Sequence, residues 1–194
     1  MIECFENFKS DKSISIFDVD DTLVVSKSKI RVHNPKTGYW ASLTPQEFNT
    51  FSHRHGDKLD FSDFSDIEKL KAGKIIEWVF NILKRTLSKG KPVGIITARG
   101  DSKLIYDFLI HHDVKINKEL IFAVNDPVHK YKGTTAQKKK QAFMDLINIG
   151  FRDFRFFDDD RENIKLAKEL EKEHPEVNMH TVLIKQKWIP TYND

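Results

Sequence analysis

The chain has 194 residues, a formal net charge of +3 at pH 7 and 31% charged residues. This length is enough for one domain with a full core. Its apolar runs are far shorter than the roughly 18 residues of a membrane-spanning helix, and residues 1–6 lack the basic start and apolar stretch of a signal peptide. Because Cys4 is the only cysteine, no internal disulfide can form, and we expect a cytoplasmic protein without a membrane partner.

The first predicted strand, residues 14–17, ends at three acids within four positions, namely Asp18, Asp20 and Asp21. Like charges at the end of a buried strand repel one another strongly unless a positive group neutralises them. Carboxylate oxygens are the ligands that Mg²⁺ prefers, together with water and substrate phosphate. The sequence therefore predicts a magnesium site at the end of this strand.

The next segment carries hairpin and helix signals. Alternating residues at 29–33 and 39–43, separated by an Asn/Pro/Gly cluster, predict a β-hairpin. The sequence Thr-Pro-Gln-Glu at 44–47 predicts a helix start, with a Thr N-cap and a Glu three residues later, and we expect this helix to end near His53. Residues 54–66 have no regular pattern and are predicted to be irregular.

Helices and strands alternate along the rest of the chain. The spacing of apolar residues predicts helices at 74–88, 101–112, 135–149 and 161–173, and strands at 92–96, 120–124, 154–157 and 179–184. This alternation predicts an α/β fold with a doubly wound parallel sheet. Without an internal repeat or linker, we expect one domain over residues 1–194, with residues 24–73 as a small insert, residues 1–12 as an arm and residues 186–194 as a tail.

Two strand ends resemble a known pattern. The sequence Asp18-x-Asp20-x-Thr22 after a hydrophobic strand resembles the first signature of the haloacid dehalogenase (HAD) superfamily of phosphohydrolases. A second apolar strand that ends in Thr97-Ala98-Arg99 resembles the second signature of this superfamily. The hydroxyl of Thr97 can bind a phosphoryl oxygen, and the guanidinium of Arg99 suits phosphate. Alternatively, Thr97 caps the next helix and Arg99 lies on the surface.

A lysine near the start of a helix is the third signature. Lys138, Lys139 and Lys140 compete for this role, and Lys132 is a more distant candidate. Lys139 falls on the apolar face of the predicted helix, so we expect its ammonium group to point toward the sheet. Lys138 and Lys140 would then face solvent or a polyanionic substrate.

The fourth signature follows the predicted strand at 154–157. Phe156-Phe157-Asp158-Asp159 and the later pair Asn163-Ile164 are similar to a pattern of magnesium-dependent phosphatases within the superfamily. This alignment implies that Asp159 binds the metal directly and that Asp158 contacts metal-bound water or the lysine. A shift by one residue, which exchanges these two roles, stays open.

The resemblance implies a mechanism. Asp18 attacks the substrate phosphorus and forms an aspartyl-phosphate, while Asp20 acts as the general acid and then as the general base. Mg²⁺ is held by Asp18, by the backbone carbonyl of Asp20 and by Asp159. Thr97 and Lys139 stabilise the transferring oxygens. The resemblance thus implies a Mg²⁺-dependent phosphomonoesterase.

The substrate is predicted from the insert and from side chains near the signatures. Thr22 favours a phosphatase over the ion-pumping ATPases of the superfamily, and Thr22, Arg99 and Lys138 are the predicted substrate contacts. A small insert leaves the cleft open, which suits nucleotides or nucleic-acid ends, and the chain resembles the phosphatase half of bacteriophage polynucleotide kinase-phosphatase. Basic and aromatic residues of the insert could bind a nucleotide: Lys27, Lys29, Arg31, Lys36, Tyr39 and Trp40. Alternatively, Tyr39 and Trp40 pack the hairpin on the body of the protein. For the function, the alternatives are a phosphatase of small metabolites such as sugar phosphates, or a binding module without turnover.

Overall fold

The central feature of the fold is a five-stranded parallel sheet. A computed structural model describes residues 12–185, so that the predicted tail and almost all of the predicted arm lie outside the described residues. The strands follow the order β10-β9-β1-β7-β8, and every neighbouring pair is parallel. Their bounds are β1 Ser13–Phe17, β7 Val93–Thr97, β8 Ile121–Ala123, β9 Asp153–Asp158 and β10 Asn178–Leu183. The predicted α/β class and parallel sheet are confirmed.

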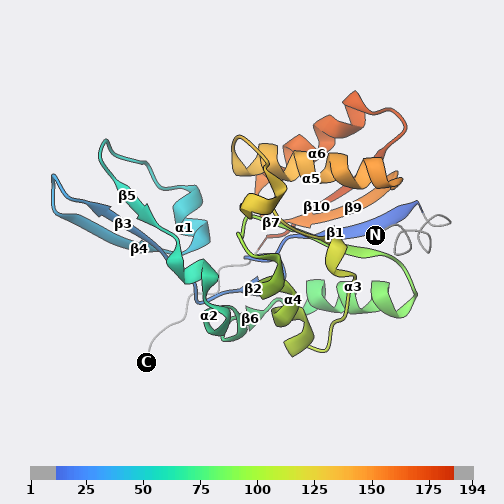
Figure 1. Ribbon diagram of the computed structural model, residues 1–194, viewed down its shortest axis with the longest axis horizontal. Helices are drawn as coiled ribbons and strands as arrows, with labels where there is room; N and C mark the ends of the chain where they lie inside the picture. Colours follow the sequence, from blue (N-terminus) through green and yellow to red (C-terminus); the bar gives the residue numbers. More distant parts are fainter. Residues whose placement is uncertain (1–11, 186–194) are drawn as a thin grey trace.

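Helices cover both faces of this sheet (Figure 1). They are α3 Glu77–Ser88 and α4 Ser102–His111 on one face, and α5 Thr135–Ile149 and α6 Arg161–Glu173 on the other. Alternate residues of β1 divide between the two layers because successive side chains of a strand point to opposite faces. Phe17 packs in the core beneath α3 and α4, whereas Ile14 and Ile16 pack against α5 and α6. No helix within the described residues is long and apolar enough to cross a membrane.

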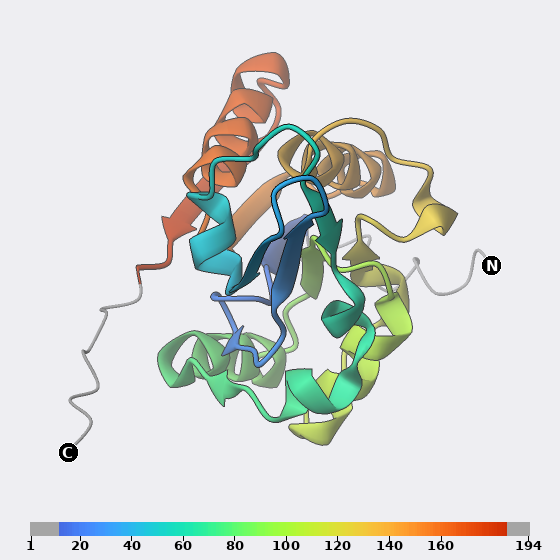
Figure 2. The same ribbon diagram turned by 90° about the vertical axis from the view of Figure 1, so that its left-hand side faces the viewer.

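Residues 30–60 of the insert project from the sheet as a separate lobe, seen end-on in Figure 2, whereas residues 67–71 pack against α4. The base of the insert is closed by β2 Val24–Val25, which pairs with β6 Lys74–Ile75. A three-stranded antiparallel sheet follows in the order β4-β3-β5. The other elements of the insert are β3 Ile30–Asn34, β4 Tyr39–Leu43, α1 Pro45–Asn49, β5 Lys58–Asp60, the 3-10 helix η2 Ser62–Ser65, and α2 Ile67–Lys71.

The predicted hairpin and helix start of the insert are confirmed. Strands β3 and β4 pair in register, and Thr44 and Glu47 form a complete capping box at the start of α1. Helix α1 ends at Asn49, earlier than predicted. The prediction of irregular structure at 54–66 is wrong because β5 pairs with β3, a contact between distant segments that the exposed sequence of β5 does not reveal.

The remaining boundaries differ from the predictions by a few residues. The helix predicted from residue 74 begins at Glu77, because Lys74 and Ile75 pair with β2 instead. Two short 3-10 helices lie on either side of β8, η3 Lys118–Leu120 before it and η4 Pro127–His129 after it. The carboxyl ends of β1, β7 and β9 point toward the insert (Figure 1), which places the predicted polar groups at one edge of the sheet.

Candidate active site

Three carboxylates converge at the carboxyl ends of β1 and β9. These strands are neighbours whose last apolar residues, Phe17 and Phe157, stand opposite each other. One carboxylate oxygen each of Asp18, Asp158 and Asp159 lies within 4.8 Å of the others. We call these three residues the acid cluster. The acids of the first and fourth signatures, far apart along the chain, therefore meet at one point.

A buried lysine faces the acid cluster from α5. The Nζ atom of Lys139 donates to Asp18 Oδ1 at 2.8 Å and to Asp158 Oδ2 at 2.7 Å. Lys139 is only 3% exposed, because it lies on the face of α5 that packs on the sheet. Burial alone would lower its pKa, but the carboxylates of Asp158 and Asp18 outweigh this effect and raise the pKa of Lys139. Lys139 is therefore charged at neutral pH.

The other candidate lysines point elsewhere. Lys138 Nζ donates to Asn125 Oδ1, Lys140 Nζ pairs with Glu173, and Lys132 is exposed. Of the four candidates, Lys139 alone lines the cavity described below. Lys138 was predicted to contact substrate; it does not line the cavity itself, but its partner Asn125 does.

Asp158 and Asp159 have different surroundings. Asp158 is fully buried and accepts hydrogen bonds from Lys139, from Asn163 Nδ2 at 3.0 and 3.1 Å, and from the backbone N–H of Asp160 at 2.8 Å. Asp159 is partly exposed and lines the cavity. Asp158 therefore has both oxygens engaged with protein donors, and Asp159 is the acid better placed to accept a ligand from the cavity. This arrangement favours the predicted order of roles over the shift by one residue.

Asn163 is a site residue that sequence reasoning used only for alignment. Its amide group holds both oxygens of Asp158 from the first turn of α6. The sequence did contain a signal for this contact, which is the spacing of five residues between Asp158 and Asn163. At this spacing, an amide in the first turn of a helix can reach the carboxylate at the end of the preceding strand.

The acid cluster has pKa values that are far from the usual range. Burial raises the pKa of Asp18 to about 7, against the attraction of Lys139 and with the added repulsion of Asp158. Burial and the charges of Asp18 and Asp158 raise the pKa of Asp159 to about 8. Three carboxylates facing one ammonium group leave an excess of negative charge. A divalent cation that prefers oxygen ligands fits this donor set.

Asp20 belongs to a second network, which is centred on Arg99. Arg99 Nε and Nη2 each donate to a carboxylate oxygen of Asp20 at 2.8 Å. The guanidinium also donates to the backbone carbonyl of Phe64 at 2.8 Å and to Ser28 Oγ at 3.3 Å, both in the insert. Ser26 Oγ donates to Asp20 as well, at 2.7 Å. The carboxylate of Asp20 is thus held apart from the acid cluster.

Arg99 was predicted to bind phosphate or, alternatively, to lie on the surface; the surface alternative is wrong because Arg99 is buried, and it lines the cavity described below. Arg99 is 2% exposed, and its donors are engaged by Asp20 and by the insert. A buried guanidinium needs a compensating charge, and Asp20 provides it at the end of the neighbouring strand. Arg99 therefore positions Asp20 and links the sheet to the insert.

The two predicted threonines lie in different places. Thr97 is 1% exposed and lines the cavity, and its Oγ1 accepts from the backbone N–H of Arg99 at 3.4 Å. It does not cap the next helix, because Asp101 caps α4. Thr22 is fully buried and does not line the cavity, so the predicted contact between Thr22 and substrate is not supported. Its Oγ1 has no hydrogen-bond partner within residues 12–185.

A cavity of about 510 Å³ lies between the sheet edge and the insert. Its floor includes Asp18, Asp20, Thr97, Lys139 and Asp159. Its roof is formed by apolar residues of the insert, which are Ile30, Pro45, Phe48, Phe61 and Phe64. The cavity therefore joins a charged floor to an apolar roof, and the volume is in the range of small-ligand sites, about 300–1,000 Å³.

The aromatic residues that the sequence suggested for stacking are not part of this roof. Trp40 stacks on His33 with ring centroids 4.8 Å apart, and the Arg54 guanidinium lies 4.3 Å from the ring centroid of Tyr39. Both rings contact other residues of the insert, and Trp40 is 62% exposed, so the alternative that they pack the hairpin on the body is not supported either. The phenylalanines of α1 and η2 line the cavity in their place.

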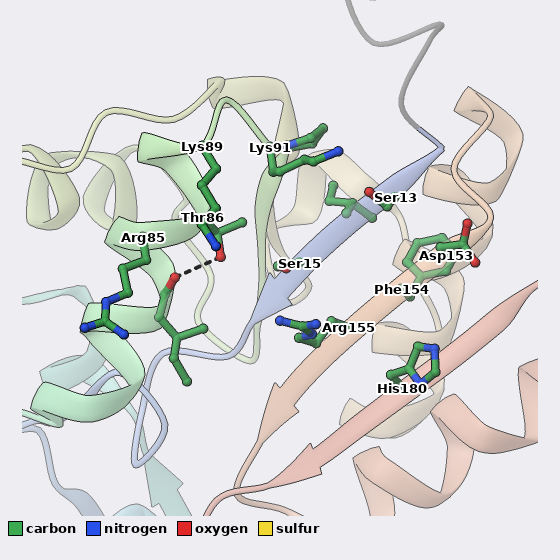
Figure 3. A pocket seen from close by; sticks show the side chains of 13 residues that line it. Ser13, Ser15, Arg85, Thr86, Lys89, Lys91, Asp153, Phe154, Arg155 and His180 are labelled. Atoms are coloured by element: carbon green, nitrogen blue, oxygen red, sulfur yellow. Dashed lines mark hydrogen bonds between the residues drawn. The ribbon is translucent and has the colours of Figure 1, made fainter.

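A second hollow, of about 550 Å³, lies at the opposite ends of the strands. Figure 3 shows Arg85 of α3 and Lys89, which follows this helix, on one side of it, and Arg155 and His180 of the sheet on the other. Asp153 is the one acid among its lining residues, so this hollow does not have the group of carboxylates that marks the acid cluster.

Comparisons of the chain with protein-family models, with curated proteins and with solved structures found no match. The chemistry of the site is therefore inferred from its own geometry.

Proposed function

We propose that the protein is a Mg²⁺-dependent phosphomonoesterase that forms an aspartyl-phosphate on Asp18. The observation that carries this proposal is the meeting of Asp18, Asp158, Asp159 and Lys139 at the end of two adjacent parallel strands. The order of the four motifs, which resembles that of the HAD superfamily, supports the same reaction. A cavity that opens on Asp18 gives a phosphorylated substrate access to it.

Asp18 and Asp159 of the acid cluster, which face the cavity, would hold the metal, and Asp158 would support them through its bond with Lys139. A bound Mg²⁺ supplies positive charge that offsets the repulsion between the carboxylates and the phosphoryl group. Lys139 fixes Asp18 through Oδ1, so we assign Oδ2 as the oxygen that attacks phosphorus. Because Lys139 is preorganised in a buried site, it stabilises negative charge without first being desolvated.

The chemistry proceeds in two steps. In the first, a carboxylate oxygen of Asp18 bonds to phosphorus, the bond to the ester oxygen breaks, and Asp20 gives its proton to the leaving alcohol. In the second, Asp20 takes a proton from water, the water oxygen attacks phosphorus, and inorganic phosphate leaves with Asp18 restored. Thr97 lines the cavity beside these groups and can donate its hydroxyl to a phosphoryl oxygen.

The fork between Arg99 and Asp20 has a consequence for the first step. Both oxygens of Asp20 accept from Arg99, so one of them must leave this fork before it can carry a proton to the leaving group. Arg99 also holds the insert through the backbone of Phe64. We therefore infer that the release of Asp20 and the position of the insert are coupled.

Hydrolysis of a chromogenic phosphomonoester with Mg²⁺ tests the proposal. We expect turnover that stops on addition of a chelator and returns with excess Mg²⁺. Asp18→Asn should abolish it, because an amide is a far weaker nucleophile than a carboxylate. Asp153→Asn is the matched control, since it makes the same change at the opposite end of the adjacent strand. Absence of turnover in the Mg²⁺-loaded protein, or equal turnover by Asp18→Asn, would contradict the proposal.

A further inference from the structure

The roof of the cavity has a chemical character that hydrolysis of phosphate does not require. Five of the six lining residues from the insert are apolar, and Ser65 is the sixth. Phe61 is 47% exposed, although it lines a cavity that also contains the charged side chains of Asp18, Lys139 and Asp159. A large apolar ring at the wall of an open cavity loses free energy to water unless a ligand covers it. The roof therefore matches a ligand with an apolar, flat portion.

The three phenylalanines form a series of contacts that begins at Arg99, the partner of Asp20. The guanidinium that holds Asp20 lies 5.0 Å from the ring centroid of Phe64. The ring centroids of Phe64 and Phe61 are 6.3 Å apart, and those of Phe61 and Phe48 are 5.6 Å apart at an interplanar angle of 88°. One guanidinium and one phenyl ring thus stand between Asp20 and Phe61 in this series of contacts.

This spacing distinguishes between classes of phosphate ester. In a phenyl phosphate the ring is bonded directly to the phosphate, so Phe64, the ring in contact with Arg99, would suffice to pack on it. In a nucleoside monophosphate a ribose separates the base from the phosphate, which suits a ring beyond the first one. A sugar phosphate would place hydroxyl groups against side chains that offer them no hydrogen bond, at a cost in binding.

We propose that Phe48 and Phe61 form a subsite for a nucleobase, with the phosphate of the same nucleotide on the floor beside Asp18 and Lys139. The ligand is a nucleoside monophosphate, or the phosphorylated terminal nucleotide of a strand, which has the same chemistry. Stacking on phenylalanine accepts every base because each has a flat π-face. This inference rests on the proposed function, since it names the leaving group of the same site.

Paired substrates that differ only in the base provide the test. We expect the kcat/KM of adenosine 5′-monophosphate to exceed that of ribose 5-phosphate by about 5- to 150-fold, the range that stacking of one base provides. Phe61→Ala should bring this ratio close to one by lowering kcat/KM for the nucleotide alone, and Phe61→Trp should keep it. A 5′-phosphorylated oligonucleotide serves as a second arm and distinguishes a strand end from a free nucleotide.

Trp40→Ala is the matched control, because Trp40 is an aromatic residue of the same insert that is 62% exposed and lies outside the cavity lining. This variant should leave the ratio unchanged. A wild-type ratio near one, or an equal loss in Phe61→Ala and Trp40→Ala, would overturn the inference. So would a Phe61-dependent preference for phenyl phosphate over both nucleotide substrates.

A binding measurement separates this inference from the proposed function. The Asp18→Asn variant with Mg²⁺ is titrated calorimetrically with adenosine 5′-monophosphate and with ribose 5-phosphate, with and without Phe61→Ala. If the nucleotide binds more tightly than ribose 5-phosphate and Phe61→Ala removes this difference, the subsite is supported. This holds even if the wild-type protein hydrolyses neither compound, a result that would refute only the proposed function. Equal affinity for both compounds would refute the subsite while leaving hydrolysis standing.

Discussion

Replacing Lys139 with methionine removes the ammonium group that bonds to both Asp18 and Asp158. All three side chains are nearly or fully buried, and the two ion pairs have N···O distances of 2.8 and 2.7 Å. Methionine keeps most of the volume of the lysine stem, so packing against the sheet is largely preserved. The variant therefore isolates the loss of charge from the loss of shape.

Removing one partner of a buried ion pair costs about 3–5 kcal/mol of stability, because the remaining charge is left uncompensated. With a urea dependence of about 2 kcal/mol per M, the midpoint of unfolding should fall by about 2 M in metal-free buffer near neutral pH. The loss should be smaller in acid. Lys139 lowers the pKa of Asp18, so without it the carboxyl takes up a proton more readily and the repulsion is relieved.

Urea unfolding followed by circular dichroism measures these changes. Lys138→Met is the matched control, because Lys138 is the residue directly before Lys139. In the described part of the chain its ammonium group bonds to Asn125 at the exposed surface. We expect its stability to change by no more than about 0.5 kcal/mol. If Lys139→Met unfolds at the same urea concentration as Lys138→Met in metal-free buffer, the ammonium group is not what holds the two carboxylates together.

Three further predictions concern metal, packing and the second network. Because the pKa values of Asp18 and Asp159 are raised from 3.8 to about 7 and about 8, the folded metal-free protein holds protons that the unfolded chain releases, and its stability should fall as pH rises through this range. Mg²⁺ should therefore raise Tm more near pH 8 than near pH 5.5, and Asp159→Asn should reduce this shift. Gly94→Ala should cost about 1–3 kcal/mol in urea unfolding, since its Cβ would lie 2.9 Å from a methyl carbon of β1, whereas Gly100→Ala, whose nearest contact would be 3.5 Å, should not. Arg99→Lys keeps the charge but loses the two-point fork, so we expect kcat to fall about tenfold or more with folding retained, and an unchanged kcat would contradict the positioning of Asp20.

Local signals in the sequence predicted the elements whose stability is local. The start of α1 was predicted because the cap at Thr44 and Glu47 is formed within four residues. Lys139 was chosen over its neighbours because the helical period places it on the same face as Ala142 and Phe143, which pack on the sheet. The meeting of residues 18 and 159 followed from parallel strands, whose carboxyl ends share one edge.

The missed features depend on contacts between distant segments. The partner of Arg99 is Asp20, 79 residues earlier in the sequence, and no spacing rule connects these two positions. Strand β5 forms only because β3 offers it an edge, so its short and exposed sequence gave no signal. Phe48 and Phe61 line the cavity because the insert folds back over the edge of the sheet. The sequence predicted irregular structure at 54–66 and therefore gave no indication of this arrangement.

The two buried networks divide the site according to the parts of the fold that they connect. The network of Lys139 joins β1, β9 and α5, which all belong to the core, so its geometry is fixed by the packing of the sheet. The network of Arg99 joins β7 and Asp20 to Ser28 and the backbone of Phe64, which belong to the insert. On the proposed mechanism, a ligand that stacks on the roof would therefore move Asp20 through Phe64 and Arg99 without disturbing Asp18. For this reason, changes in the insert should affect protonation of the leaving group while metal binding to the acid cluster stays intact.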